Sequence, residues 1–419
     1  MRFERMHIFA GNWQHSPNQK TIKWLLLLGL ILGILINPLH LKAQNLDDLY
    51  RFIGSKDSIL VTDSQEQILL TKNADKKLIP ASILKIFTSL VALHYLGEDY
   101  RFPTEFYVDE QSNLKIKGYG DPLLISETIL KISQVLAVLL KNSQPLNNLI
   151  LDDSYFSQPL TIPGVTSSSQ PYDAPNGALC ANFNTVTFKR SSQGYVSAET
   201  QTPLLPFVIK KIKASKLKKG RIVFSHNKNE ITIYAGKLFL HFLEKQGIRF
   251  TGKVKRGRIN ADTDRLIFRY DSVSSLQQIV AKLLEHSNNF TTNQLLIATG
   301  AEIIGTPGTL AKGVAIASDY AKEMLGIENM TIAEGSGISR NNRVSAAQMD
   351  QILQEFLPYH YLMRREGREF YKTGTLYGVS TRAGYIKSAG GELYRYVIML
   401  NTPGKSTDSL ILRLLRILE

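Results

Sequence analysis

The stretch PASILKIFTSLVALHYLG, residues 80–97, carries the strongest structural pattern in the chain. Pro80 suits the first position of a helix, where its missing N–H would have no partner in any case, and Gly97 suits a C-terminal stop. Between them the apolar residues recur at helical spacing, at Ile83, Leu84, Ile86, Phe87, Leu90, Val91 and Leu93. The pattern predicts a buried helix over residues 80–96.

Two residues near the start of this helix, Ser82 and Lys85, are a candidate nucleophile and base. A spacing of three places both side chains on one helical face, where a lysine can take the proton of a serine nucleophile. The dipole at a helix N-terminus disfavours the charged ammonium and favours a developing oxyanion. Ser-x-x-Lys also occurs at Ser112, Ser215 and Ser225, but only Ser82 opens an apolar helix. The plainer alternative is a capping serine beside a surface lysine.

Two further tripeptides follow in order along the chain. Ser287-Asn288-Asn289 lies between segments of helical periodicity, unlike the Ser-x-Asn strings at Ser16, Ser225 and Ser339. Lys372-Thr373-Gly374 occurs once, just before a strand-like segment. With Ser-x-x-Lys, these strings make up the motif set of penicillin-interacting serine enzymes. Their order and contexts predict a site for serine acyl transfer.

Composition narrows the class of protein. The chain has 419 residues, 43% apolar and 21% charged, with a net charge of +14, which is globular and large enough for two or more domains. This excludes disorder, collagen and a polytopic membrane protein. The one cysteine, Cys180, excludes an intramolecular disulfide and any site of several thiolates, and the eight histidines show no ligand spacing. No metal or cofactor is expected.

The N-terminal segment has the pattern of an export signal. An apolar run, Trp24–Ile36, follows four basic residues and precedes Ala43, a small residue suited to cleavage. At ~1.5 Å per residue its helix would span ~20 Å, less than the ~30 Å hydrocarbon core. We expect residues 1–44 to be a signal peptide. The alternative is an uncleaved membrane anchor that also uses Leu39 and Leu41. In either case the remainder is expected in the periplasm or cell envelope.

The positive charge is concentrated in one region. Residues 210–258 hold fifteen Lys or Arg against Glu230 and Glu244, and the rest of the chain beyond the leader is close to neutral. One interpretation is a solvated, lysine-rich face. The other is a surface attracted to anionic envelope polymer or lipid headgroups. Nucleic acid is not expected as a partner of an exported chain.

Periodicity divides the chain into helical flanks and a β-rich middle. Helices are expected at 126–141, 275–285, 292–301, 345–357 and 406–418. Strands are expected at 105–108, 114–117, 149–151, 185–188, 221–224, 231–234, 381–387 and 394–400, with a loop over 157–178. We predict a host domain of residues 45–99 and 272–419, interrupted by an inserted β-rich domain of residues 100–271.

With these strings the chain resembles the penicillin-binding D-alanyl-D-alanine carboxypeptidase/endopeptidase family of low molecular mass, class C. Besides the three motifs, the resemblance rests on Gly120-Asp121-Pro122, Asp152–Phe156, Ala174-Pro175 and Gly335–Arg340, and it covers about residues 46–402. It implies an α/β (α+β) fold of the serine β-lactamase/DD-peptidase type. Such a fold has an antiparallel sheet flanked by helices, a helical subdomain and, here, a β-rich insertion.

The resemblance also implies a function and a role for each motif residue. The substrates would be peptidoglycan stem peptides ending in D-Ala-D-Ala, and β-lactam antibiotics would inhibit. Ser82 would be the acylated nucleophile and Lys85 its base. Ser287 would relay a proton to the leaving amine, and Asn289 would bind the substrate amide.

The remaining roles fall on the Lys-Thr-Gly segment. Lys372 and Thr373 would hold the terminal carboxylate of the peptide, and Gly374 would let the substrate strand approach. The backbone N–H groups of Ser82 and Thr375 would form the oxyanion hole.

Two other functions stay open. A serine β-lactamase shares the fold and the acylation chemistry but needs fast deacylation, and no dedicated water-activating carboxylate can be assigned. A non-catalytic envelope-binding protein of the same fold would not need the intact motifs. Relatives often carry an acidic side chain before Ala-Pro that meets the amine of the peptide's third residue. This chain has Thr166–Ser169 there, so its third-residue specificity is left open.

Overall fold

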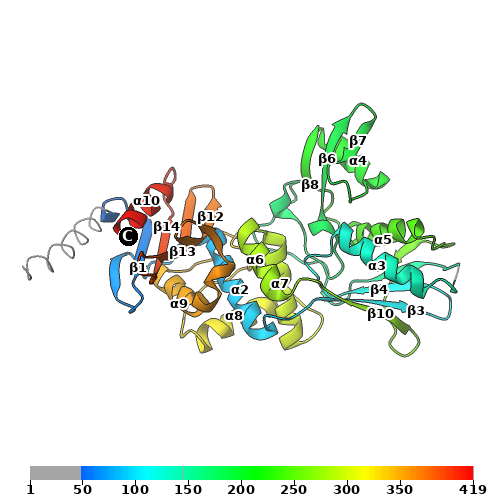
Figure 1. Ribbon diagram of the computed structural model, residues 1–419, viewed down its shortest axis with the longest axis horizontal. Helices are drawn as coiled ribbons and strands as arrows, with labels where there is room; N and C mark the ends of the chain where they lie inside the picture. The colour runs from blue at the N-terminus through cyan, green and yellow to red at the C-terminus, as the bar shows by residue number, and fades with distance from the viewer. Residues whose placement is uncertain (1–48, 144, 419) are drawn as a thin grey trace, which may run out of the picture. The chain divides into compact units, whose positions relative to one another are not determined.

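The computed structural model describes residues 49–143 and 145–418. Two units divide the chain at residues 52/53, and the helices and strands labelled in Figure 1 belong to the second, residues 53–419. The predicted leader, residues 1–44, lies outside the described residues. Within the described part of the chain, no helix is long and apolar enough to cross a membrane.

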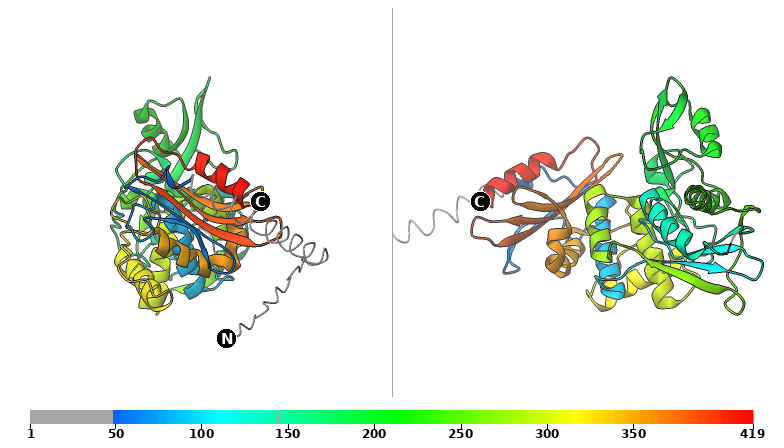
Figure 2. Two further views of the ribbon diagram at one scale, coloured as in Figure 1. Left: turned by 90° about the vertical axis from the view of Figure 1, so that its left-hand side faces the viewer. Right: turned by 45° about the vertical axis from the view of Figure 1, so that its right-hand side comes forward.

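A six-stranded antiparallel sheet brings together segments from both ends of this second unit. Its strands lie in the order β11-β12-β13-β14-β1-β2. Their bounds are Asp57–Thr62 (β1), Ile68–Lys72 (β2), Arg364–Glu366 (β11), Glu369–Leu376 (β12), Val379–Lys387 (β13) and Leu393–Leu400 (β14). The strands predicted at 381–387 and 394–400 are β13 and β14. Helix α10 (Asp408–Ile417) lies on one face of the sheet and α9 (Ala346–Phe356) on the other, as Figure 1 and Figure 2 show.

The predicted helix over residues 80–96 is the centre of a helical cluster beside this sheet. It begins with a 3-10 turn, η1 (Ala81–Ile83), and continues as α2 (Leu84–Leu96). Every residue from Leu84 to Leu93 is buried, as expected for a helix that is apolar on all sides. Helix α2 contacts α6 (Leu276–His286), α7 (Asn289–Ile304), α8 (Leu310–Glu323) and α9. One continuous apolar core joins these helices to the sheet.

The middle of the chain builds two further sheets. A five-stranded mixed sheet has the order β10-β3-β4-β5-β9. Its strands are Pro103–Val108 (β3), Leu114–Gly118 (β4), Leu149–Asp152 (β5), Val254–Arg256 (β9) and Arg265–Asp271 (β10). A three-stranded antiparallel sheet, order β7-β6-β8, is formed by Thr185–Ser191 (β6), Gly194–Ser197 (β7) and Lys219–Val223 (β8). Helices α3 (Ser126–Leu139), α4 (Pro206–Ser215) and α5 (Lys228–Lys245) accompany these sheets around a second apolar core.

The prediction of a strand at residues 231–234 was wrong, because these residues lie inside α5. Asn227 caps this helix, its side chain accepting hydrogen bonds from the N–H groups of Asn229 and Glu230. Its buried face includes Ile231, Tyr234, Ala235, Leu238, Phe239 and Phe242. That spacing is helical, but it becomes visible only over three turns, whereas the prediction rested on four residues rich in β-branched side chains.

The remaining expected helices and strands are present, with bounds that differ by a few residues. Helices α4 and α8 and strands β7, β9, β10, β11 and β12 were not predicted, so Lys372-Thr373-Gly374 lies within a strand and not before one. The architecture confirms the predicted antiparallel sheet flanked by helices, with a helical cluster and additional sheets from the middle of the chain. The domain boundaries at residues 99/100 and 271/272 stay predictions.

Candidate active site

Ser82 lies in the 3-10 turn η1, where the helical cluster meets strand β12. The preceding residue, Ala81, has a φ of +49°, a conformation that costs a non-glycine residue energy and persists only when the surroundings hold it. Two contacts hold it here. The Thr381 hydroxyl donates a 2.6 Å hydrogen bond to the carbonyl of Pro80. A side chain at Gly337 would place its Cβ 1.8 Å from the Ala81 carbonyl oxygen, so only glycine fits there.

Lys85, one turn along, is fully buried and its Nζ has three oxygen neighbours. These are Ser82 Oγ at 2.9 Å, Asn289 Oδ1 at 2.7 Å and the carbonyl of Ser336 at 2.6 Å. The alternative reading of a capping serine beside a surface lysine is therefore wrong. Ser82 makes no side-chain capping bond, and the lysine is inside the protein.

The three contacts satisfy the lysine in both of its protonation states. A charged ammonium can donate to all three oxygens. A neutral amine can donate to Asn289 and Ser336, leaving its lone pair to accept the proton of the Ser82 hydroxyl. The proton can thus pass between Ser82 and Lys85 without moving a heavy atom, which is the arrangement a general base requires.

The charge around Lys85 favours the neutral amine. Burial lowers the pKa of Lys85 well below its usual value, and the positive charge of Lys372 lowers it further. The carboxylate of Glu334 acts in the opposite direction. A lysine with a lowered pKa carries more of the unprotonated form near neutral pH, as a base must.

Asn289 and Ser287 belong to the turn between α6 and α7. Ser287 ends α6 in the left-handed conformation, with a φ of +54°, and Asn288 caps α7 by accepting a 3.0 Å hydrogen bond from Thr291 N–H. Asn289 is the first residue of α7. Its side chain is fixed at both ends, because Oδ1 accepts from Lys85 and Nδ2 donates to the carbonyl of Tyr172 at 3.2 Å.

Lys372, Thr373, Gly374 and Thr375 lie in sequence on β12, beside Ser82. A Cβ at Gly374 would lie 2.6 Å from the backbone nitrogen of Ser82, so glycine is what allows this approach. Lys372 is only 3% exposed. Burial, followed by the charge of Arg364, lowers the pKa of Lys372 to about 8, so it is still a cation at neutral pH. The side chains of Thr373 and Thr375 are exposed.

The outer edge of β12 is open at this segment. The neighbouring strand, β11, pairs only with Glu369, Phe370 and Tyr371. Among the described residues, no strand pairs with the outer edge of residues 372–376. An extended peptide can add to such an edge through main-chain hydrogen bonds.

The structure thus brings together most of the predicted site residues. Hydrogen bonds join Ser82, Lys85 and Asn289, and close packing joins Gly374 to Ser82. Lys372 acts on Lys85 through its charge. Ser287, Thr373 and Thr375 lie on the same elements as these residues, but their own predicted contacts would be to a substrate.

A further participant is the loop of residues 334–339, which overlaps the Gly335–Arg340 string but contains none of the predicted site residues. It places the Ser336 carbonyl against Lys85, and its own conformation is held by the buried carboxylate of Glu334. The Ser336 hydroxyl caps the backbone of this loop, since it accepts a hydrogen bond from Ile338 N–H at 3.3 Å. The sequence signal that could have predicted this role is an acidic residue directly before Gly-Ser-Gly, because the backbone N–H groups of such a turn can all donate to one carboxylate.

The stretch Thr166–Ser169, where relatives often carry an acidic side chain, is bound to an acidic residue that directly precedes Ala174-Pro175. Asp173, next to Ala174, is 1% exposed, and its carboxylate accepts hydrogen bonds from Thr166 N–H and from the hydroxyls of Thr166 and Ser168. This carboxylate is therefore used to hold the loop of residues 166–168.

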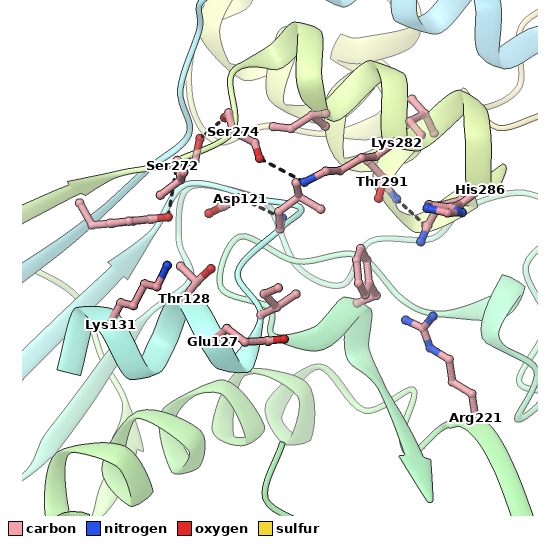
Figure 3. A pocket seen from close by; sticks show the side chains of 18 residues that line it. Asp121, Glu127, Thr128, Lys131, Arg221, Ser272, Ser274, Lys282, His286 and Thr291 are labelled. Atoms are coloured by element: carbon pink, nitrogen blue, oxygen red, sulfur yellow. Dashed lines mark hydrogen bonds between the residues drawn. The ribbon is translucent and has the colours of Figure 1, made fainter. Parts of the chain in front are cut away.

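A cavity of about 620 Å³ is a separate feature. Figure 3 shows its lining side chains, among them Thr128 and Lys131 of α3, Lys282 and His286 of α6, and Thr291 of α7. None of the predicted site residues lines it. Asp121 lies at its wall, and burial raises the pKa of this carboxyl to about 7. Among residues 49–143 and 145–418, no group of three or more His, Cys, Asp or Glu side chains could hold a metal ion.

Comparison with known proteins identifies the family of this chain. Residues 43–221 and 214–359 match the model of the D-Ala-D-Ala carboxypeptidase 3 (S13) family. A D-alanyl-D-alanine carboxypeptidase from Actinomadura sp. (strain R39) is 24% identical over 416 residues, which cover 81% of this chain and 77% of that one.

Solved structures show the same fold. Penicillin binding protein 4 (dacB) from Haemophilus influenzae has a TM-score of 0.69 at 19% identity, with 86% of this chain and 94% of that chain covered. The structure of that protein complexed with a β-lactam covers the same shares, with a TM-score of 0.64 at 19% identity. The predicted fold of the DD-peptidase type is confirmed.

Proposed function

This chain belongs to the D-Ala-D-Ala carboxypeptidase 3 (S13) family of serine peptidases, and from that premise we propose that it cleaves peptidoglycan stem peptides through an acyl-enzyme on Ser82. The observation that carries the proposal is the position of Lys85. Its buried Nζ lies 2.9 Å from Ser82 Oγ, with two further acceptors for its remaining protons.

The proposed reaction has two halves. In the first, Ser82 Oγ attacks the carbonyl carbon of the penultimate D-alanine while its proton passes to Lys85 Nζ. The bond to the terminal D-alanine then breaks, and the leaving amine takes that proton through the Ser287 hydroxyl. In the second half, water cleaves the ester and the Ser82 hydroxyl is restored. The N–H groups of Ser82 and Thr375 would hold the oxyanion in both halves.

Substrate recognition follows from the open edge of β12. A stem peptide in extended form would pair with residues 372–376, where Gly374 leaves room beside Ser82. Its terminal carboxylate would meet the Lys372 ammonium and the Thr373 hydroxyl, and Asn289 would bind the backbone amide. Recognition of a free carboxylate by a cation is consistent with cleavage at the C-terminal D-alanine. The same groups would hold the carboxylate of a β-lactam.

We place the enzyme outside the cytoplasm, in the periplasm or cell envelope, because of the export pattern in residues 1–44 and the location of its proposed substrate. The basic region would add a surface attracted to anionic polymer or lipid there. Six lysines between residues 210 and 219 are exposed, on α4 and along the segment to β8: Lys210, Lys211, Lys213, Lys216, Lys218 and Lys219.

Mass spectrometry after incubation with benzylpenicillin tests the proposal. We expect one covalent adduct, located on Ser82 by peptide mapping, that persists far longer than a β-lactamase turnover. Ser112→Ala is the matched control, because Ser112 also begins a Ser-x-x-Lys string but lies on an exposed turn, so its adduct should form normally. An adduct on a different serine would refute the assignment. Repeated rapid turnover of penicillin would favour the β-lactamase instead.

A further inference from the structure

We propose that Glu334 is a positioning residue for the base Lys85, acting through the loop of residues 334–339. The inference rests on the proposed function of Ser82 and Lys85. Glu334 touches neither Ser82 nor the proposed path of the substrate. It holds the one backbone carbonyl, that of Ser336, on which Lys85 depends for its third contact.

The Glu334 carboxylate organises this loop almost alone. It is fully buried and accepts six hydrogen bonds. One oxygen accepts from Gly337 N–H at 2.7 Å, Ser339 N–H at 3.2 Å and the Asn342 amide at 2.8 Å. The other accepts from Ser336 N–H at 2.7 Å, the Ser336 hydroxyl at 2.6 Å and the Asn293 amide at 3.1 Å. Only a carboxylate has two acceptor oxygens. A glutamine would replace one of them with an NH₂ group, which cannot accept the three hydrogen bonds made to that oxygen.

The loop contacts α2, α7 and the turn η1, the elements that carry Lys85, Asn289 and Ser82. Asn293 lies on α7, one turn after Asn289, and its Oδ1 also accepts from Gly335 N–H at 2.8 Å. The Thr88 hydroxyl of α2 donates to the Gly335 carbonyl at 2.7 Å. Gly337 packs against the Ala81 carbonyl, beside Ser82. Glu334 therefore links the helix of the base, the helix of Asn289 and the turn of the nucleophile.

Charge gives Glu334 a second effect that can be measured. Two ionised groups act on Lys85, namely Lys372 from β12 and Glu334 from the loop, while its hydrogen-bond partners Ser82, Asn289 and the Ser336 carbonyl are uncharged. Burial and Lys372 lower the pKa of Lys85, whereas Glu334 raises it. Removing the negative charge should move the pKa of Lys85 further down.

The test compares the pH dependence of benzylpenicillin acylation in the wild-type chain and in Glu334→Gln. We expect the variant to acylate about 10–100-fold more slowly at its optimum, because the base is misplaced. We also expect the acid limb of its profile to move to lower pH by roughly one unit, because the amine is then unprotonated at lower pH. A role in folding alone would lower the amount of active protein without moving the limb.

Two more variants make the outcome decisive. Asp57→Asn is the matched control, because Asp57 is also a fully buried carboxylate outside the site, accepting hydrogen bonds from Gly54, Asn401, Thr402 and the Lys405 ammonium. This variant should lower the midpoint temperature of thermal unfolding and leave the acid limb of the pH profile unchanged. Glu334→Asp keeps the charge but shortens the side chain, so it should slow acylation with an unmoved limb.

The inference is overturned if folded Glu334→Gln acylates at the wild-type rate or keeps the wild-type limb. If Glu334→Gln does not fold, an undiminished rate in folded Glu334→Asp overturns it. Failure of the proposed function would look different, because the wild-type chain would then form no adduct on Ser82.

Discussion

Lys372 illustrates how a single buried side chain can set the working pH range of this site. Its ammonium is 3% exposed, and burial together with Arg364 lowers its pKa to about 8, while the opposing charge of Glu285 limits the decrease. The cation therefore predominates at neutral pH and is lost as the pH rises through about 8. Because the same cation lowers the pKa of Lys85, the two lysines form a coupled pair.

We predict that KM for a peptide ending in D-Ala-D-Ala rises as the pH increases through about 8, because Lys372 then loses the charge that binds the terminal carboxylate. The measurement is kcat and KM from pH 6 to 10 with such a peptide. The control is the same peptide with its carboxylate amidated, for which the rise in KM should disappear. A KM that stays constant across the range, or rises equally for both peptides, would show that Lys372 does not bind the carboxylate.

Individual residues also show where prediction from sequence succeeds and fails. Ser82, Lys85 and Asn289 were found because their spacings are local, and the structure does join them by hydrogen bonds. Glu334 was missed because three of its six donors are backbone N–H groups, which every residue type except proline offers, and another, Asn293, lies 41 residues away on α7.

At the scale of elements, the turn η1 depends on the loop that follows Glu334. Gly337, with a φ of +82°, lies against the Ala81 carbonyl. Gly97, which ends α2, has nearly the same φ of +84°, but no atom lies within 4 Å of its missing side chain. The two glycines thus share a positive φ and differ in what surrounds them.

We predict that Gly337→Ala abolishes penicillin acylation, whereas Gly97→Ala keeps it. Both variants should lose about 1–3 kcal/mol of stability, because each places a side chain at a positive φ. Only at Gly337 must the turn carrying Ser82 also shift, because the new Cβ would lie 1.8 Å from the Ala81 oxygen. Acylation kinetics and thermal unfolding of both variants check this. Comparable acylation in the two would show that the contact does not position Ser82.

The elements predicted best were those whose burial pattern repeats over several turns. Helix α2 was found from its apolar spacing, but its first turn is 3-10, because contacts with β12 and the 334–339 loop, distant in sequence, shape it. Helix α5 was misread because its first turn contains β-branched residues and its apolar face emerges only later along the chain. Tertiary packing therefore determines both the 3-10 turn before α2 and the helical conformation of residues 231–234.

At the scale of the whole molecule, the lysines of α4 and the segment to β8 form a strongly basic surface. Lys211 pairs with Glu230 at 3.0 Å, while Lys210, Lys213, Lys216 and Lys218 are exposed. Attraction between such a surface and a polyanion is long-range and is screened over a Debye length of ~10 Å at 0.1 M salt.

We predict that binding to isolated sacculi or anionic vesicles weakens from low to physiological salt, and weakens again when Lys210, Lys213, Lys216 and Lys218 are changed to Glu. Hydrolysis of a small soluble D-Ala-D-Ala peptide should stay nearly unchanged, because these lysines are outside the proposed site. Co-sedimentation measures the binding. The matched control changes four exposed lysines elsewhere to Glu, namely Lys56, Lys141, Lys322 and Lys387. If binding does not depend on salt, or is weakened equally by the two sets of Lys→Glu changes, the basic region is a solvated face and not a binding surface.

The single cysteine gives the protein a practical property for spectroscopy. Cys180 is 3% exposed, and burial raises the pKa of its thiol to about 12, so thiol-directed dyes should leave it unmodified at neutral pH. A cysteine introduced at the surface would then be the one labelled position in the chain. Tyr377, 92% exposed and next to the end of β12, is a suitable place for such a reporter. A fluorophore there could follow the arrival of a peptide or an antibiotic in real time, without first removing a native thiol.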